Sequence, residues 1–404
     1  MPHLSEHLRI APLPPSERKA SLLGGEVILP SGMRYLDPDA LNDVDKESLR
    51  NGLFQHGVLV VRDQQGLDPV LMPHIGKFFD ETAWDVHSGG DKMVTDAKNI
   101  LSLNMGARIP RAPQVQVIGK GKFEGHEGIP ELNLKHVDHT EFHETPHTAS
   151  ELADGLTRPY RWHMDAPLYE RLPGYVTTLH SLKIPELPDQ KIRFPDGEIM
   201  PIAAGATAFF SGARAFQLLS AEEREFALNT TVRYAPRAYE WIRDCKATDD
   251  GLTIAKVGKE KNLDELPDWS WDKVHSFPMV WKNHGNGDPH LQVLGCCVYE
   301  LHTTDPATGE VTVMRDMAKV RETVRKLTGK IYTPENIYAH RWQEGDLIMF
   351  HNRGVLHSIT GNLSKSAGTD GSEKRLLWQC SMASGTAPKA YTASCSTRIE
   401  SANL

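Results

Sequence analysis

The triplet His163-Met164-Asp165, followed closely by an apolar, β-branched run over residues 175–184, constrains this chain more than any other feature. The run predicts a long buried strand. In an extended segment, residues i and i+2 project to the same side, so His163 and Asp165 can reach one metal ion while Met164 packs away from it. A metal ligand needs a rigid element to hold its geometry, and this strand context supplies one.

His357, far downstream, is the expected third ligand. It follows two apolar residues on a strand that returns from a turn at 351–354, which suits an inward-facing side chain. Two imidazoles and one carboxylate on one face of a metal leave three adjacent coordination positions open, as in non-haem Fe(II) oxygenases. His351 is the rival, but its place at the turn indicates a structural hydrogen bond instead.

A second His-x-Asp pattern, His136-Val137-Asp138, lies in a histidine-rich stretch over residues 126–147. The residues that follow it show no strand pattern and predict a solvated polar loop, with one residue at most near the mouth of the site. We therefore expect the metal at His163 and Asp165 rather than here.

The composition is that of an ordinary globular protein. The chain has 404 residues, of which 39% are hydrophobic and 24% charged, so it is long enough for a sizeable core. No Pro/Gly/Ser-rich linker divides it. We expect one domain over residues 31–404, preceded by a Pro-rich and poorly ordered N-terminal arm over residues 1–30.

Several classes of protein are disfavoured. The net charge is −8 and no Lys/Arg stripe with interleaved aromatic residues is present, which argues against a nucleic-acid partner. The longest apolar runs fall short of the about 18 residues of a membrane span, and the N-terminus lacks a signal-peptide pattern. Five cysteines without metal-like spacing indicate reduced thiols in a cytoplasmic protein. We expect a small-molecule substrate.

The apolar pattern predicts many strands and few helices. Helices are expected over Asp43–His56, 220–228 and 317–327, and strands over 57–63, 114–118, 230–234, 291–299 and 345–350. Ser220 begins a capping box for the second helix. Adjacent Cys296 and Cys297 are expected on opposite faces of their strand. Because the ligands are borne by strands, we infer a mainly β fold, a sandwich or barrel with helices packed outside.

Four residues occur in an order that resembles the taurine-dioxygenase-like superfamily of Fe(II)/2-oxoglutarate oxygenases: His163, Asp165, His357 and Arg375. Residues 112–119, 160–165 and 344–357 look most similar to fungal xanthine dioxygenases. The resemblance implies a double-stranded β-helix (jelly-roll) core with Fe(II), 2-oxoglutarate as co-substrate and O2. It also implies oxidation of a substrate C–H bond, coupled to decarboxylation of 2-oxoglutarate.

Arg375 matches the family arginine that binds the far carboxylate of 2-oxoglutarate in a bidentate manner. The connection from His357 is longer than usual, and the polar stretch 364–372 accounts for the excess as a surface insertion. Arg353 is the rival, but its turn position fits a structural pairing better.

Lys191 stands where the family usually has a Thr or Ser whose hydroxyl binds the same carboxylate. Lys191 could pair with 2-oxoglutarate as a point charge. Equally, it could reach solvent while Gln190 or Arg193 takes this role.

The resemblance further implies a polar substrate pocket. Five residues match its polar positions: Gln114, Gln116, Lys135, Glu151 and Gln379. Three residues depart from the pattern: Leu152 in place of a carboxylate, Ser381 in place of an amide and Trp378 in place of an Arg. A buried purine edge that loses its polar partners is costly. The departures therefore point to a smaller or less heteroaromatic substrate than xanthine.

A related group of fungal oxygenases forms an aziridine from L-valine. Such chemistry needs a carboxylate clamp, for which Lys135 or Lys191 is a candidate. It also needs an apolar cradle, and Ile348 and Phe350 alternate onto one face of a strand, although both equally suit a jelly-roll core. We favour a small amino acid such as L-valine, with hydroxylation of xanthine to urate as the alternative.

Two other classes are compatible with parts of the pattern. A zinc hydrolase could use two His and one Asp with a bound water, but Arg375 would then be unexplained. A non-catalytic jelly-roll would not need all three ligands, and none has been lost.

Overall fold

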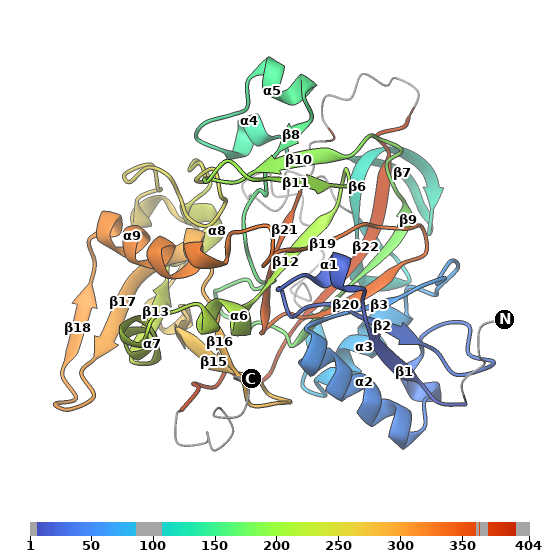
Figure 1. Cartoon of the computed structure of the whole chain (residues 1–404), viewed down its shortest axis with the longest axis horizontal. Helices are drawn as coiled ribbons and strands as arrows, with labels where there is room; N and C mark the ends of the chain where they lie inside the picture. The colour runs from blue at the N-terminus through green and yellow to red at the C-terminus, as the bar shows by residue number, and fades with distance from the viewer. Residues whose placement is uncertain (1–5, 86–106, 361–362, 364–370, 393–404) are drawn as a thin grey trace.

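The structure, a computed structural model, describes residues 6–85, 107–360, 363 and 371–392. Most of its regular structure is β, with helices at the periphery (Figure 1). The largest sheet has ten strands in the order β1-β2-β3-β20-β9-β22-β6-β5, with β4 beside β22 and β7 beside β6. These strands are β1 (Arg9–Pro12), β2 (Gly25–Ile28), β3 (Val58–Val61), β4 (Trp84–Asp85), β5 (Ala107–Ile109), β6 (Ala112–His126), β7 (Ile129–Leu134), β9 (Val176–Lys183), β20 (Leu347–His351) and β22 (Arg375–Ala383).

A three-stranded sheet packs against one face of this large sheet. It consists of β19 (Tyr338–His340), β12 (Thr207–Ser211) and β21 (Val355–Ile359). Ile348 and Phe350 of β20 share a buried apolar cluster with Phe209 of β12 and Val355 of β21. We call the face of the large sheet that carries this cluster the inner face.

Two helices cover the opposite face, as the lower right of Figure 1 shows: α2 (Asp43–His56) and α3 (Leu71–Phe79). Leu347 and Met349, which alternate with Ile348 along β20, pack there with Leu49 of α2 and Ile75 of α3. The near-continuous apolar sequence of β20 follows from this burial on both faces.

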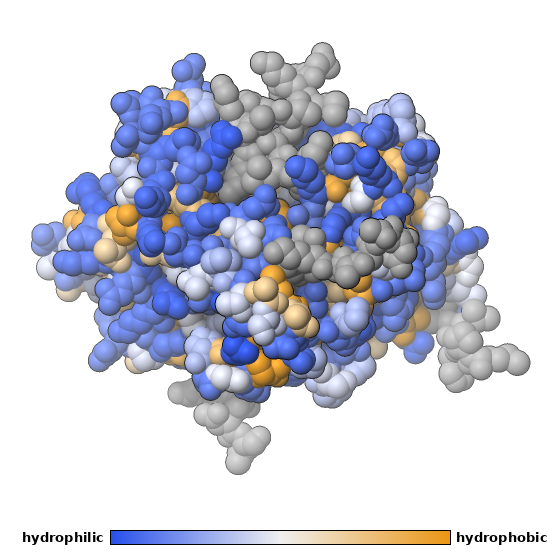
Figure 2. Space-filling view, turned by 90° about the horizontal axis from the view of Figure 1, so that it is seen from above, coloured by the Kyte–Doolittle hydropathy of each residue, from blue (hydrophilic) through white to orange (hydrophobic). Residues whose placement is uncertain are grey.

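The remaining elements form smaller units around these layers. They are β8 (Leu156–Thr157), β10 (Gln190–Arg193), β11 (Ile199–Ile202), β13 (Thr230–Tyr234), β14 (Ser276–Pro278), β15 (Val280–Lys282), β16 (Pro289–Leu291), β17 (Val298–Thr304), β18 (Val311–Met314), α1 (Pro15–Arg18), α4 (His139–Phe142), α5 (Ala149–Ala153), α6 (Gly212–Gln217), α7 (Ala221–Leu228), α8 (Ala238–Trp241) and α9 (Met317–Thr328). On the face in Figure 2, hydrophobic residues form small separate groups in a mostly hydrophilic surface. Within the described residues, no helix has the length and apolar character needed to cross a bilayer.

Residues 6–30 are not the disordered arm that their prolines suggested. β1 pairs with β2, and β2 runs parallel to β3. Leu13 and Leu23 are each 2% exposed. The prolines mislead because β1 is an edge strand, where a missing backbone N–H leaves no ladder bond unmade.

Of three other local predictions from the sequence, two are confirmed and one is wrong. α2 has the expected bounds, and Asn42 caps it by accepting a hydrogen bond from the backbone of Asp45. Ser220 begins α7 with the expected capping box. The strand predicted around Cys296 and Cys297 is wrong, because Gly295–Cys297 is a turn of 3-10 helix that buries both thiols.

Candidate active site

Three side chains converge where β21 meets the segment after β8. His163, Asp165 and His357 each offer a ligand atom, and these atoms lie within 4.8 Å of one another. The Nε2 atoms of His163 and His357 are 3.9 Å and 3.8 Å from Asp165 Oδ1. Elsewhere in the described part of the chain, no other group of His, Cys, Asp and Glu residues has this geometry.

The backbone brings the two histidines together. His163 lies outside any regular strand, but it forms an isolated antiparallel bridge with His357, with N–H···O=C distances of 2.9 Å and 2.8 Å in the two directions. Their ring centroids are 4.1 Å apart. The alternation expected from the sequence holds, because Met164 is fully buried in an apolar core while His163 and Asp165 are partly exposed.

The histidines are in the form that a metal requires. Nδ1 of His163 donates to the carbonyl oxygen of Arg161 at 2.8 Å, which leaves Nε2 unprotonated and turned toward Asp165. Burial lowers the pKa of His163 to about 3, with a further contribution from His357, and burial lowers that of His357 to about 3. Both rings are therefore neutral at pH 7, as metal ligation demands.

Asp165 is held from two sides. Gln379 of β22 donates to its Oδ2 at 3.2 Å, leaving Oδ1 for the histidine side. Asn352, which is fully buried, accepts from the backbone N–H of Asp165 at 2.7 Å and donates to its carbonyl at 2.9 Å and to that of Gly174 at 3.1 Å. Sequence reasoning missed Asn352, and the available signal was an amide directly after a buried strand.

In the second His-x-Asp pattern, Asp138 caps a helix and does not join the group of candidate metal ligands. Asp138 accepts from the backbone of Thr140 at 2.7 Å, and Glu141 accepts from the backbone of Asp138 at 3.2 Å, a capping box for α4. The expected solvated loop is wrong here. His139, His143 and His147 are 2%, 1% and 8% exposed, because the short helices α4 and α5 fold this stretch back onto the protein.

His351 does not make the structural hydrogen bond expected of its ring. Within the described residues both ring nitrogens lack a partner, although the backbone N–H donates to Gly57 at 2.8 Å. The ring packs edge-on against Phe54, with centroids 5.0 Å apart. It projects to the side of β20 opposite Phe350, whose ring lies 4.7 Å from that of His357.

Arg375 begins β22 and is 3% exposed. Burial lowers its pKa to about 10, so it stays cationic at pH 7, and no carboxylate of the described residues forms an ion pair with it. A methyl group at Gly205 would lie 3.1 Å from its Cδ, so the glycine gives the side chain room. Arg353 instead donates to the carbonyl oxygens of Pro173 and Thr386, as expected of a structural residue.

Lys191 is exposed on β10, where it alternates with Ile192, which is 1% exposed. Arg193 forms an ion pair with Glu151 at 3.2 Å. The exposure of Lys191 contrasts with the burial of Arg375. The stretch 364–370 lies outside the described residues.

Four of the expected pocket residues share the inner face of the large sheet. Gln116 and Gln379 are directly opposite in the β6–β22 ladder, and Gln114 and Ser381 follow at two-residue spacing. Trp378 was expected in the pocket, but it faces the helix-covered side of the sheet. It is 2% exposed and donates from Nε1 to His126 at 2.9 Å.

The other expected pocket residues have different surroundings. Lys135 is exposed after β7. Glu151 and Leu152 are half-buried in α5, where the backbone of Thr148 donates to Glu151 and lowers its pKa to about 2. Ile348 and Phe350 are fully buried, and Phe350 packs behind His357, which favours the core interpretation.

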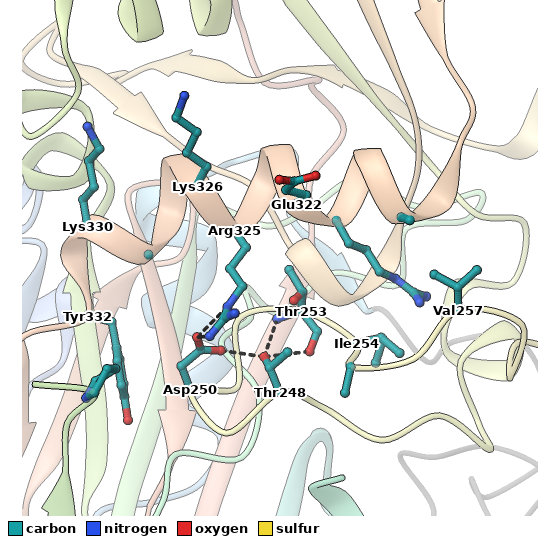
Figure 3. Close-up of a pocket in the computed structure, with 15 residues that line it drawn as sticks. Thr248, Asp250, Thr253, Ile254, Val257, Glu322, Arg325, Lys326, Lys330 and Tyr332 are labelled. Atoms are coloured by element: carbon teal, nitrogen blue, oxygen red, sulfur yellow. Dashed lines mark hydrogen bonds and ion pairs between the residues drawn. The ribbon is translucent and has the colours of Figure 1, made fainter. Parts of the chain in front are cut away.

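A surface hollow of about 760 Å³ lies between α9 and residues 248–257, away from the triad (Figure 3). Some of its polar groups pair with one another: Arg325 pairs with Asp250 at 2.8 Å, and Thr248 donates to the same carboxylate at 2.5 Å. Nothing in this hollow resembles the ligand set at His163.

The comparisons agree with this geometry. Residues 9–381 match the model of the family described as taurine catabolism dioxygenase TauD, TfdA family. The chain is 40% identical over 352 residues to an alpha-ketoglutarate-dependent xanthine dioxygenase of Emericella nidulans, covering 87% of this chain and 91% of the relative. It is 36% identical over 387 residues to a protein of the same description from Schizosaccharomyces pombe, covering 95% and 90%.

A solved structure of a taurine dioxygenase from Burkholderia xenovorans shares the fold, with a TM-score of 0.52 at 14% identity, covering 95% of this chain and 93% of that one. The matched family model spans nearly all of the described residues, including the three converging side chains. The chain belongs to the TauD/TfdA family of dioxygenases.

Proposed function

We propose that this protein is an Fe(II)- and 2-oxoglutarate-dependent dioxygenase with a double-stranded β-helix core, formed by the large sheet and the β19-β12-β21 sheet. His163, Asp165 and His357 hold the metal. The donor set supports this assignment, since two neutral imidazoles and one carboxylate on one side of an ion suit iron and leave positions open for co-substrate and oxygen.

Arg375 is the observation that carries the co-substrate assignment. A buried guanidinium without an ion-pair partner among the described residues is costly, and a carboxylate from a ligand would satisfy it in bidentate fashion. A zinc hydrolase would leave this residue without a purpose. We therefore assign Arg375 to the far carboxylate of 2-oxoglutarate (alpha-ketoglutarate), with Lys191 outside this site.

The bound group supplies the oxidising chemistry: iron, O2 and 2-oxoglutarate together oxidise a substrate C–H bond, with release of succinate and CO2. The protein's own residues orient the metal ligands and shield them from water. Gln379 fixes the carboxylate of Asp165, and Arg161 fixes the tautomer of His163 through its carbonyl. Phe350 and Phe209 pack against His357 and keep water from its inner side.

Xanthine is the first candidate substrate. The relatives with 36–40% identity carry that substrate in their names. Gln114, Gln116 and Gln379 share the inner face, and the amide of Gln379 reaches Asp165; a row of amides suits a purine edge. Trp378 no longer argues against a purine, because it faces away from these amides.

A small amino acid such as L-valine is the second candidate. Ser381 lies on the same inner face and stands where the xanthine-dioxygenase pattern has an amide. Leu152 stands where that pattern has a carboxylate, so two polar partners of a purine are missing. The carboxylate of such a substrate needs a cation, and Lys135 and Lys191 are the candidates from the sequence, although both are exposed. A buried cation would pair with a carboxylate more strongly than an exposed lysine.

Aerobic incubation with Fe(II) and 2-oxoglutarate, with succinate measured, tests the proposal. We expect slow succinate formation without substrate and faster formation with either xanthine or L-valine. Stimulation by one of them identifies the substrate class, and product analysis distinguishes hydroxylation from ring closure. Absence of succinate under all conditions, with the metal shown to be bound, would refute the dioxygenase assignment.

A further inference from the structure

Arg161, two residues before His163, is a buried cation that the roles above do not use. It is 8% exposed, and two of its donors, Nε and Nη1, are buried without a hydrogen-bond partner among the described residues. Burying an unpaired charge or an unsatisfied donor is costly, so proteins rarely do so without a ligand or a compensating group. The side chain therefore needs an explanation.

Two other buried arginines, Arg321 and Arg353, have hydrogen-bond partners within the described residues. Arg321 is 7% exposed and donates to the carboxylate of Glu260 and to the carbonyl of Lys256. Arg353 is 6% exposed and donates to the carbonyls of Pro173 and Thr386. Arg161 is as buried as these two, but its Nε and Nη1 lack such acceptors among the described residues, so burial alone does not account for these donors.

The position of Arg161 is tied to the triad. Its carbonyl accepts from Nδ1 of His163, and the next residue, Trp162, donates its backbone N–H to Gly251 at 3.0 Å. Burial is the largest cause of the low pKa of His163 and of His357, and the charge of Arg161 lies close enough to the triad to lower both further. Trp162, between Arg161 and His163, is buried in the apolar core at 1% exposure.

Aromatic rings cover the faces of the guanidinium but not its edge. The centroid of Tyr239 is 5.1 Å from its central carbon, and that of Phe142 is 5.8 Å away. Tyr239 is itself anchored, because its hydroxyl donates to the carbonyl of Ala166 at 2.8 Å, directly after Asp165. Cation–π contacts stabilise the charge, but in-plane N–H groups still need acceptors.

We propose that Arg161 binds an acidic edge of the primary substrate, a planar pair of acceptor atoms such as a carboxylate or an ionised purine edge. This inference rests on the proposed function and adds to it a second cation, distinct from Arg375, that selects substrates by charge. A guanidinium fork matches two adjacent acceptors and rejects a neutral amide that offers one acceptor and two donors. Arg161 is also the cation that an amino-acid substrate would require.

The test compares wild type with Arg161→Met, which keeps an unbranched apolar side chain without the charge, and Arg161→Lys, which keeps the charge without the fork. Arg341→Met is the control, because Arg341 is exposed and pairs with Asp189 at the surface. Each protein is loaded with Mn(II) and 2-oxoglutarate without oxygen. Xanthine, L-valine and L-valinamide are then titrated, with the thermal unfolding midpoint as the readout.

We expect xanthine or L-valine, but not L-valinamide, to raise the midpoint of wild type and of Arg341→Met. Arg161→Met should need about 10- to 100-fold more ligand for the same shift, and Arg161→Lys an intermediate amount. Affinities for Mn(II) and 2-oxoglutarate should be unchanged. Weaker binding of L-valine to Arg161→Met would show that Arg161 binds a carboxylate, and weaker binding of xanthine would show that it binds an ionised purine edge.

Three outcomes would overturn the inference. The first is equal ligand shifts in wild type and Arg161→Met, including no shift in either. The second is lost 2-oxoglutarate affinity in Arg161→Met, which would assign Arg161 to the co-substrate. The third is equal stabilisation by L-valine and L-valinamide. Failure of wild type to bind Mn(II) and 2-oxoglutarate would instead refute the proposed function itself.

Discussion

The backbones of His163 and His357 exchange both of their hydrogen bonds, at 2.9 Å and 2.8 Å, although the two residues come from distant parts of the sequence. Residues paired in this way lie about 5.5 Å apart at Cα, so their side chains leave the backbone together. The two imidazoles therefore lie side by side, with ring centroids 4.1 Å apart.

Metal binding should depend on the triad and not on the second His-x-Asp pattern. We expect His163→Ala and Asp165→Ala to lose one equivalent of Mn(II) in equilibrium dialysis, because two remaining ligands hold a divalent ion poorly. Asp138→Asn is the matched control and should retain full stoichiometry, because Asp138 caps α4. Loss of metal in Asp138→Asn, or its retention in Asp165→Ala, would contradict the assignment.

Gln379 should increase the affinity for the metal through its hydrogen bond to the ligand Asp165. Gln379→Leu removes the donor to Oδ2 of Asp165, and such outer partners typically contribute about 10- to 100-fold to metal affinity. Trp378→Phe is the control on the opposite face of the same strand, and we expect it to lower stability without changing the Mn(II) dissociation constant. Equal metal affinity in wild type and Gln379→Leu would show that the hydrogen bond has no such role.

Arg375 and Lys191 should differ sharply in their effect on the co-substrate. Arg375→Gln is expected to raise the KM for 2-oxoglutarate about 10- to 100-fold, because it removes a charge-assisted bidentate contact. Lys191→Ala should leave this KM within about twofold, because Lys191 is exposed on β10. The assignment fails if Lys191→Ala has the larger effect.

Stability should fall as the pH drops below about 6.5, the ordinary pKa of histidine. Burial lowers the pKa of His143 and of His180 to about 4. Between these values the unfolded chain takes up protons that the native rings do not, so each histidine costs about 1.4 kcal/mol per pH unit as the pH falls. Urea unfolding from pH 7.5 to 4.5 should show this slope, and His180→Gln should reduce it. A slope unaffected by His180→Gln would mean that this ring titrates normally in the native protein.

The local elements could be predicted from sequence because their signals are local. The bounds of α2, the capping box of α7 and strand β13 follow from short patterns. β1 and β2 could not, because their place at the edge of the sheet depends on pairing with β3 far along the chain. Cys296 shows the same limit, since an apolar run does not distinguish a strand from a buried turn.

The triad was predictable because its first two ligands are close in sequence and residue chemistry restricts the third. The residues that orient these ligands could not be predicted. Asn352 acts through contacts with Asp165 and Gly174, and no spacing rule links these positions. Trp378 was misplaced because adjacent strand residues face opposite sides, so an alignment position alone does not say which side faces the site.

The most direct test of the account follows 2-oxoglutarate itself. Purified protein with Fe(II) and O2 should convert it to an equal amount of succinate, and Asp165→Ala should form none under the same conditions. That result would tie the chemistry to the triad. Equal succinate formation by both proteins, or none by wild type with iron bound, would contradict the account.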